Sequence, residues 1–108
     1  MQLGLKASTD VVQIQNRLQH HPDVFEFHLT EADFTPEGWA HFQEMVAWVQ
    51  ETVPHVVFHH PMKWHGLRME LCVNKLMFPQ LYQFVMQSSR RLITYAKEVG
   101  AVALIHGG

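Results

Sequence analysis

The feature that most constrains this chain is a short apolar run near its middle, residues 56–61 (VVFHHP), which ends in two imidazoles and a proline. A run this short, rich in β-branched and aromatic residues and bounded by Pro54 and Pro61, is typical of a buried strand. Residues 24–29 (VFEFHL) and 101–108 (AVALIHGG) repeat the pattern, because both are apolar and both carry a histidine. We therefore predict parallel strands whose carboxyl ends bring imidazoles to one edge of a sheet.

Helical patterns separate these strands. The predicted helices cover residues 11–21, 36–53 and 81–99, and a short first strand covers residues 3–8. The middle helix has the clearest signal, because Thr35 offers an N-cap hydroxyl and Pro36 suits the first helical position. Apolar side chains then recur at spacings of three and four, at Trp39, Phe42, Val46, Val49 and Val53. The order β-α-β-α-β-loop-α-β predicts an α/β fold with a parallel sheet and right-handed crossovers.

Two connections are expected to be irregular. Residues 30–34 (TEADF) form a polar stretch that predicts a loop, and residues 62–66 (MKWHG) predict a loop over the strand ends. Residues 67–78 are compatible with a short helix. A long excursion between a strand and the next helix is often functional.

The composition limits the class of protein. With 108 residues, of which 47% are hydrophobic, the chain is expected to form a single domain over residues 1–108. The net charge of −2 speaks against a nucleic-acid partner. The lone cysteine, Cys72, suits the cytoplasm, and no apolar run approaches the roughly 18 residues of a membrane span. The outlier is histidine, with nine copies, and histidine is both the commonest metal ligand and the usual acid–base group near neutral pH.

Four motifs in this order resemble those of the xylose-isomerase-like barrel superfamily, which includes sugar-phosphate isomerases, epimerases and enzymes of the endonuclease IV type. Residues 24–28 (VFEFH) resemble its Glu-φ-His strand, and residues 59–62 (HHPM) are similar to its His-x-Pro-Tyr, with Met62 in place of the aromatic. Residues 88–101 resemble its helix before strand four, and residues 105–108 (IHGG) are close to its Val-His-x-Gly. The resemblance covers essentially the whole chain and implies the first half of a (β/α)₈ barrel, in the order (βα)₃β.

The resemblance also implies a site at the carboxyl ends of the strands. His59 and His106 match metal or substrate ligands, with Zn²⁺ or Mn²⁺ as the expected ion, and Glu26 matches an acid near the sugar. Further candidates for substrate contact are His28, His60, Lys63 and Trp64. Because His59 and His60 are adjacent in a strand, they point to opposite sides of the sheet, and the resemblance favours His59 for the barrel interior.

The implied function is metal-assisted isomerisation or epimerisation of a sugar or sugar phosphate. One alternative is phosphodiester cleavage of the endonuclease IV kind. The acidic net charge disfavours it, because phosphate contacts need Lys and Arg. The other is a truncated barrel without catalysis that binds a ligand or associates with itself. A closed barrel needs eight βα units and about 250 residues, so we expect this chain to be part of a longer enzyme or to pair with a second copy.

Overall fold

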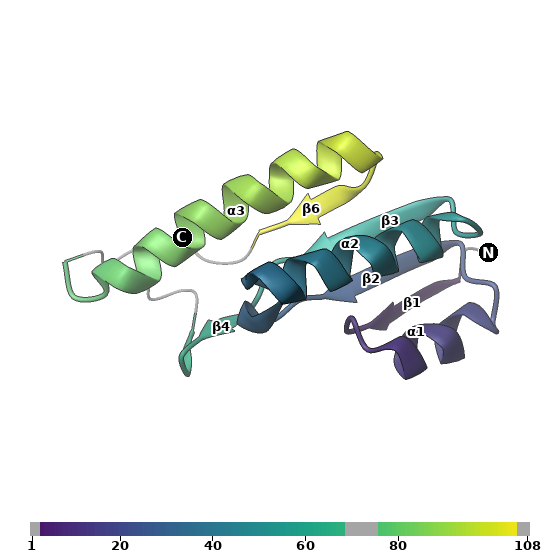
Figure 1. The fold of residues 1–108 in the computed structure, drawn as a ribbon, viewed down its shortest axis with the longest axis horizontal. Coiled ribbons are helices and arrows are strands. Elements are labelled where there is room, and N and C mark those ends of the chain that lie inside the picture. Colours follow the sequence, from purple (N-terminus) through teal and green to yellow (C-terminus); the bar gives the residue numbers. More distant parts are fainter. Residues whose placement is uncertain (1–2, 69–75, 106–108) are drawn as a thin grey trace.

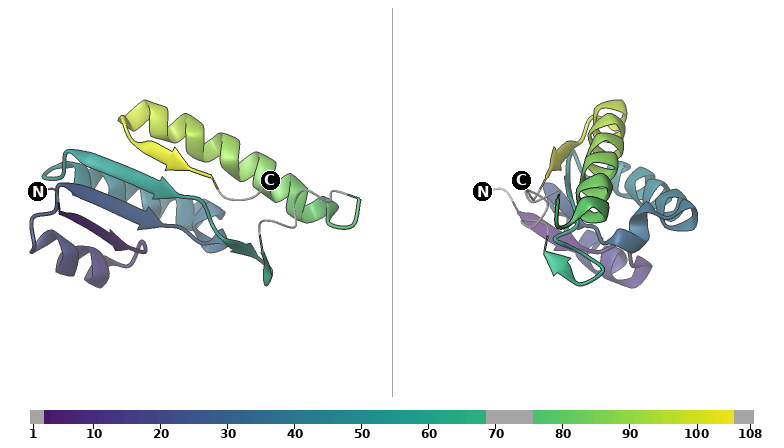
Figure 2. Two further views of the ribbon diagram at one scale, coloured as in Figure 1. Left: turned by 180° about the vertical axis from the view of Figure 1, so that it is seen from behind. Right: turned by 90° about the vertical axis from the view of Figure 1, so that its left-hand side faces the viewer.

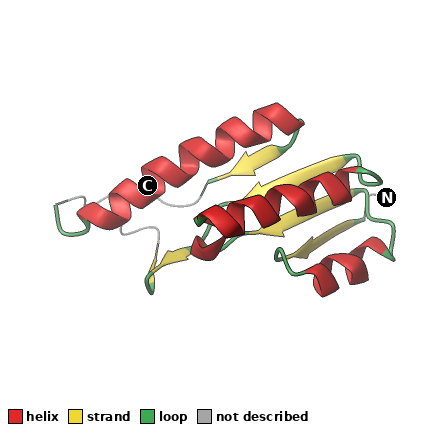
Figure 3. Cartoon of the chain, viewed as in Figure 1, coloured by secondary structure: helices red, strands yellow, loops and turns green. Residues whose placement is uncertain are grey.

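The computed structural model describes residues 3–68 and 76–105, and it is a mixed α/β structure with a four-stranded parallel sheet (Figure 1, Figure 3). The strands of the sheet are β1 (Gly4–Ala7), β2 (Val24–His28), β3 (His55–His59) and β6 (Val102–Leu104). The helices are α1 (Val11–Leu18), the 3₁₀ turn η1 (Glu31–Phe34), α2 (Pro36–Gln50) and α3 (Pro79–Val99). A small hairpin adds β4 (Lys63–Trp64) and β5 (Leu67–Arg68). The predicted alternation of parallel strands with three helices is confirmed.

The sheet has the order β1-β2-β3-β6, and every neighbouring pair is parallel. Figure 2 shows α1, α2 and α3 on the same side of this sheet. The strand residues on that side are buried, as Phe25, Phe27, Val56 and Phe58 show. The other face carries no helix among the described residues, so the sheet has one packed face and one open face.

The core lies between the packed face and the helices. Aromatic rings form its centre: Phe42 of α2 lies 4.9 Å from Phe58 and 5.6 Å from Phe27, between ring centroids. Tyr95 of α3 stacks on Phe58 at 5.6 Å. The apolar stripe predicted for the middle helix is buried at all five positions, Trp39, Phe42, Val46, Val49 and Val53. Large aromatic rings bury much apolar area, which fixes the helices on the sheet.

Local signals explain where the helices start and stop. The Asp10 carboxylate accepts a hydrogen bond from the backbone N–H of Gln13 at 3.0 Å and caps α1. The Thr35 hydroxyl accepts one from the N–H of Gly38 at 3.1 Å and caps α2. Gly100 ends α3 with a φ of +73°, a left-handed conformation that glycine adopts without a steric penalty.

Two stretches that were predicted to be loops form regular structure, a 3₁₀ turn and a hairpin. Residues 30–34 contain η1, whose fold depends on Asp33: its carboxylate accepts hydrogen bonds from the Thr30 N–H at 2.8 Å and the Thr9 hydroxyl at 2.9 Å. Within residues 62–68, strands β4 and β5 pair antiparallel around His65 and Gly66, which both have positive φ, as in a type I′ turn. Residues 69–75 of the predicted short helix lie outside the described residues.

The hairpin packs against the first half of α3 and not against the main core. Leu81 and Val85 of α3 form a second buried cluster with Trp64 and Leu67 of the hairpin. Figure 1 shows this half of α3 extending past the carboxyl ends of the sheet strands. The structure thus builds a wall beside the edge of the sheet where the site is expected. No helix in the described part of the chain is long and apolar enough to cross a bilayer.

Candidate functional site

The open face of the sheet carries polar side chains in two adjacent rows. Residues that are partners in a parallel sheet point to the same face, so the register defines each row. The first row is Lys6, Glu26, Val57 and Val102, and the second is His28, His59 and Leu104. The acidic and imidazole groups therefore come from the neighbouring strands β2 and β3 and meet near their carboxyl ends.

Glu26 and His59 are in direct contact. The distance from His59 Nε2 to Glu26 Oε1 is 2.8 Å, which is a short hydrogen bond between an imidazole and a carboxylate. The side chain of Glu26 is 34% exposed and that of His59 16%, so solvent or a ligand can reach the carboxylate. The ring of His28 stacks on that of His59 with centroids 4.2 Å apart and planes 11° apart, which fixes the orientation of His59 from its other side.

A hollow of about 400 Å³ adjoins this group at the carboxyl ends of β2 and β3. It is lined by residues 28–31 and 59–63, and so by four of the predicted site residues: His28, His59, His60 and Lys63. In parallel α/β folds this edge is where ligands bind. The hollow has room for a small ligand that touches His59, the member of the Glu26–His59 pair that lines it.

His60 and Trp64 are held elsewhere. His60 is only 1% exposed and points to the packed side, where its Nε2 lies 2.6 Å from the hydroxyl of Ser88 in α3. Although His60 is among the residues that line the hollow, its ring bonds Ser88 and belongs to the interface between sheet and helix. Trp64 stacks on Phe84 of α3 at 5.6 Å and does not line the hollow. The structure therefore places these two rings among packing residues, apart from the Glu26–His59 pair.

The donor set for a metal ion is incomplete within residues 3–68 and 76–105. No group of three His, Cys, Asp or Glu side chains there is close enough to hold an ion. Glu26 and His59 supply two donors, whereas a catalytic zinc site has three protein ligands. His106, the other predicted ligand, lies outside the described residues.

Two residues of this edge were missed in the sequence. Lys6 lies in register with Glu26 on the open face, and Glu31 lines the hollow while its Oε1 accepts a hydrogen bond from the N–H of His65 at 3.2 Å. Lys6 is the polar position in an otherwise apolar short strand, which is a signal for the open face once the register with β2 is known. The sequence around Glu31 shows only a polar loop and gives no indication that this residue lines a hollow.

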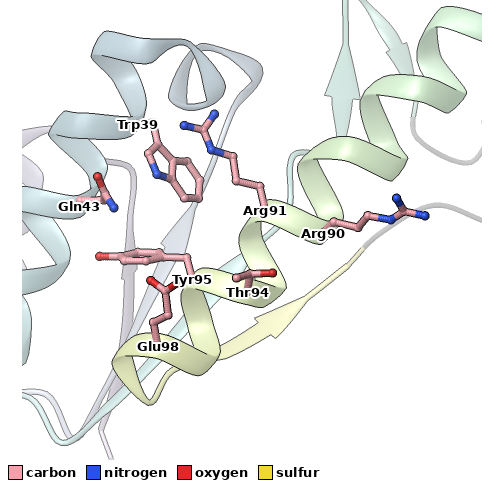
Figure 4. A pocket seen from close by; sticks show the side chains of 7 residues that line it. All are labelled: Trp39, Gln43, Arg90, Arg91, Thr94, Tyr95 and Glu98. Atoms are coloured by element: carbon pink, nitrogen blue, oxygen red, sulfur yellow. The ribbon is translucent and has the colours of Figure 1, made fainter.

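A second hollow, of about 450 Å³, lies between α2 and α3 on the far side of the sheet (Figure 4). The guanidinium carbon of Arg91 lies 4.3 Å from the centroid of the Trp39 ring, in a cation–π contact. The Tyr95 ring forms the floor next to Trp39, and Glu98 lies beside it (Figure 4). This hollow is separated from the Glu26–His59 pair by the sheet itself.

Tyr95 should make the fold sensitive to alkaline pH. Burial raises the pKa of its hydroxyl above the ordinary 10.0, and the Glu98 carboxylate raises that pKa further. The unfolded chain therefore loses the tyrosine proton at a lower pH than the folded chain does. The protonated hydroxyl of Tyr95 supports the fold fully below pH 10, and this support is lost as the pH rises through the pKa of the folded state. We expect the free energy of unfolding, measured with urea, to fall above about pH 10, and Tyr95→Phe to flatten that fall. Tyr82→Phe is the matched control, and an equal flattening by it would contradict the prediction.

Scans against protein-family models, curated proteins and solved structures found no match to this chain. The resemblance to the xylose-isomerase-like superfamily therefore stays a prediction from the four motifs.

Proposed function

We propose that the open face of the sheet is the inner wall of half a (β/α)₈ barrel and that Glu26 and His59 isomerise or epimerise a sugar or sugar phosphate there. The observation that carries the proposal is the 2.8 Å contact between His59 Nε2 and Glu26 Oε1, beside a hollow at the carboxyl ends of parallel strands. A carboxylate oriented by an imidazole is a suitable proton acceptor and donor. The resemblance at residues 24–28 and 59–62 supports the same assignment.

The proton-transfer step can be written for these residues. Neutral His59 donates its Nε2–H to Glu26 Oε1, which leaves the second carboxylate oxygen to take a proton from the sugar carbon next to the carbonyl. The electron pair of that C–H bond forms the double bond of an enediol, and the carbonyl oxygen takes up a proton from water. In an isomerisation the carboxyl group of Glu26 then returns its proton to the former carbonyl carbon, while the neighbouring hydroxyl loses its proton to water and becomes the new carbonyl group. Positioned acid–base groups of this kind contribute about 10²–10⁴-fold to the rate.

One lysine borders the hollow and another stands beside Glu26, and both favour an oxygen-rich or anionic substrate. Lys63 lines the hollow, and Lys6 stands in the same row as Glu26. An ammonium group can hold a hydroxyl or a phosphate as a point charge. Both lysines would thus bind the substrate and leave proton transfer to Glu26.

A divalent ion, Zn²⁺ or Mn²⁺, is the second part of the proposal. His59 would provide one of its ligands, through the ring nitrogen that does not bond Glu26, and the remaining ligands would come from outside the described residues. A bound ion would polarise the sugar carbonyl. The proton transfer described above depends on Glu26 and His59 alone.

The barrel is proposed because a parallel sheet is normally covered on both faces. Here the open face presents Val57, Val102 and Leu104 together with the polar groups. A sheet closed into a barrel would enclose that face and screen the site from water. A place in the cytoplasm is part of this proposal and is supported by the single cysteine, Cys72.

The test is proton exchange on a panel of aldoses, ketoses and their phosphates in D₂O, followed by NMR with and without added Zn²⁺ or Mn²⁺. We expect deuterium to enter the carbon next to the carbonyl of at least one sugar, and His59→Gln to reduce the rate about 100-fold or more. His21→Gln, at an exposed position in the turn after α1, is the matched control. A sugar that binds at the hollow without exchange would favour the non-catalytic module instead.

A further inference from the structure

A cavity of about 230 Å³ lies between η1 and α3, and no step of the proposed reaction uses it. We call it the Phe34–Phe84 cavity, and its lining consists of Phe34 of η1 and, from α3, Phe84, Gln87, Ser88 and Arg91. Spacings of three and four place the four α3 residues along one face of the helix. The cavity is smaller than the roughly 300–1,000 Å³ of pockets for drug-sized ligands, so it suits a ligand with a single ring.

Two aromatic rings form an apolar corner in this cavity. The ring centroids of Phe34 and Phe84 lie 5.8 Å apart with the planes at 83°, so the rings meet edge to face. Both side chains are only partly buried. Each is held by a further ring, because Trp39 lies 5.5 Å from Phe34 and Trp64 stacks on Phe84 at 5.6 Å. A fixed aromatic corner favours a flat ring as its occupant, since aromatic pairs gain from both stacked and edge-on contact.

The buried side of the cavity is polar, but it offers no proton to an anion. Ser88 is 4% exposed, and its hydroxyl donates a hydrogen bond to the carbonyl oxygen of Phe84 at 2.6 Å. The Ser88 oxygen also lies 2.6 Å from Nε2 of His60. A carboxylate only accepts hydrogen bonds, so it finds no donor in a hydroxyl whose proton is already used. The charged end of a ligand must therefore lie at the other side of the cavity, near Arg91.

Arg91 is the only cation among the five lining residues, and it is exposed. Its guanidinium carbon lies 4.3 Å from the centroid of the Trp39 ring (Figure 4), and its Nη1 donates a long hydrogen bond of 3.4 Å to the carbonyl oxygen of Phe34. Neither contact neutralises its charge, and no carboxylate in the described part of the chain forms an ion pair with it. A guanidinium has five N–H donors, enough to hold a carboxylate through two bonds beside these contacts.

We propose that the Phe34–Phe84 cavity binds an aromatic monocarboxylate of about the size of benzoate. The carboxylate would bond Arg91, and the ring would pack against Phe34 and Phe84. One guanidinium suits one negative charge, whereas a phosphate monoester carries about −1.5 to −2 at neutral pH and would leave part of that charge unpaired. The cavity uses neither Glu26 nor His59, so the proposal is independent of the reaction proposed for that pair.

The hollow between α2 and α3 is a poorer place for the same ligand, although Arg91 lines it as well. The carboxylate of Glu98 lines that hollow and would repel a second carboxylate. Its two aromatic residues, Trp39 and Tyr95, are only 7% and 8% exposed, so they offer little surface to a ring. The partly exposed rings of the Phe34–Phe84 cavity, without an acidic neighbour in the lining, therefore decide the assignment.

Titration of the ¹⁵N-labelled full chain with benzoate, followed by NMR at neutral pH, tests the proposal. We expect saturable shifts of the amides of Phe34, Phe84 and Ser88, with a dissociation constant of about 0.1–1 mM, as is usual for so small a ligand. Nuclear Overhauser contacts should join the benzoate ring to both phenylalanine rings. Acetate lacks the ring and benzamide lacks the charge, so each should bind at least about tenfold more weakly.

Two variants separate the charge from the space. Arg91→Met should weaken benzoate binding about 10–100-fold, whereas the matched control Arg90→Met, at the neighbouring exposed arginine, should change it less than about threefold. Gln87→Trp keeps Arg91 and fills the cavity from an exposed position of α3, so it should abolish binding and leave the circular dichroism spectrum unchanged. Gln83→Trp, exposed on α3 but outside the lining, should bind benzoate normally.

Three results would overturn the proposal. The first is the absence of saturable shifts up to about 20 mM benzoate. The second is equal binding of benzamide and benzoate, because the charge of Arg91 would then play no part. The third is a set of shifts centred on His28 and Lys63, because the carboxylate would then occupy the hollow on the open face of the sheet.

Discussion

Replacing Glu26 with Gln is expected to slow deuterium exchange into the sugar about 10²–10⁴-fold, the usual contribution of a positioned general base. Glutamine has nearly the same shape and still accepts a hydrogen bond from His59 Nε2, whose partner distance is 2.8 Å. It cannot accept a proton from carbon. The free energy of unfolding should change by less than about 1 kcal/mol, because glutamine keeps the hydrogen bond and the pair is partly exposed. The loss would thus report chemistry and not folding.

Two control variants separate the role of Glu26 from a general effect of negative charge. Glu31→Gln removes a carboxylate that lines the same hollow but is bonded to the backbone of His65, so it should alter the exchange rate by less than about tenfold. Lys6→Met should raise the substrate concentration needed for half-maximal exchange more than it lowers the maximal rate, because the role proposed for Lys6 is to bind the substrate and not to transfer a proton. If Glu26→Gln exchanged deuterium at the rate of the unaltered chain, Glu26 would not be the base.

The fold was largely predictable because its strands and long helices carry strong periodic patterns. The stripe from Trp39 to Val53 and the runs at residues 24–29 and 56–61 each bury one face. The spacing of the buried residues distinguishes a helix from a strand. The β4–β5 hairpin was not predictable, since two-residue strands are too short to show a period. Its turn depends on His65 in a left-handed conformation, which the sequence signals only through the glycine that follows.

The residues of the candidate site could be predicted from the sequence, but their contacts with one another could not. Alternation along β3 correctly separates the faces of His59 and His60, because adjacent strand residues point to opposite sides. Which residues of β2 stand beside them depends on the register between strands, and no single-sequence pattern encodes it. The contacts of His59 with Glu26 and His28, and the place of Lys6 in the same row, follow from that register.

Gly38→Ala should destabilise the fold by about 1–3 kcal/mol, the range of an added methyl group that forces the backbone to move. A Cβ at position 38 would overlap the backbone carbonyl oxygen of Ala32 and lie 3.0 Å from the Cα of Asp33. Those atoms belong to η1, which cannot give way cheaply because Asp33 is bonded to Thr30 and Thr9. Glycine is needed here for the close approach of helix and turn, since its φ is ordinary for a helix. Urea unfolding of the variant measures the loss.

Gly4→Ala is the matched control, because a Cβ there meets only the Cβ of Val24 at 3.9 Å, an ordinary contact. It should leave the free energy of unfolding within about 1 kcal/mol of the unaltered chain. The turn that Gly38 allows also carries Glu31 into the hollow, so binding of a sugar at the hollow should weaken in Gly38→Ala even under conditions where the variant is folded. Equal stability of the two variants would mean that η1 adjusts freely, and the hollow would then lack the fixed wall on which a positioned substrate depends.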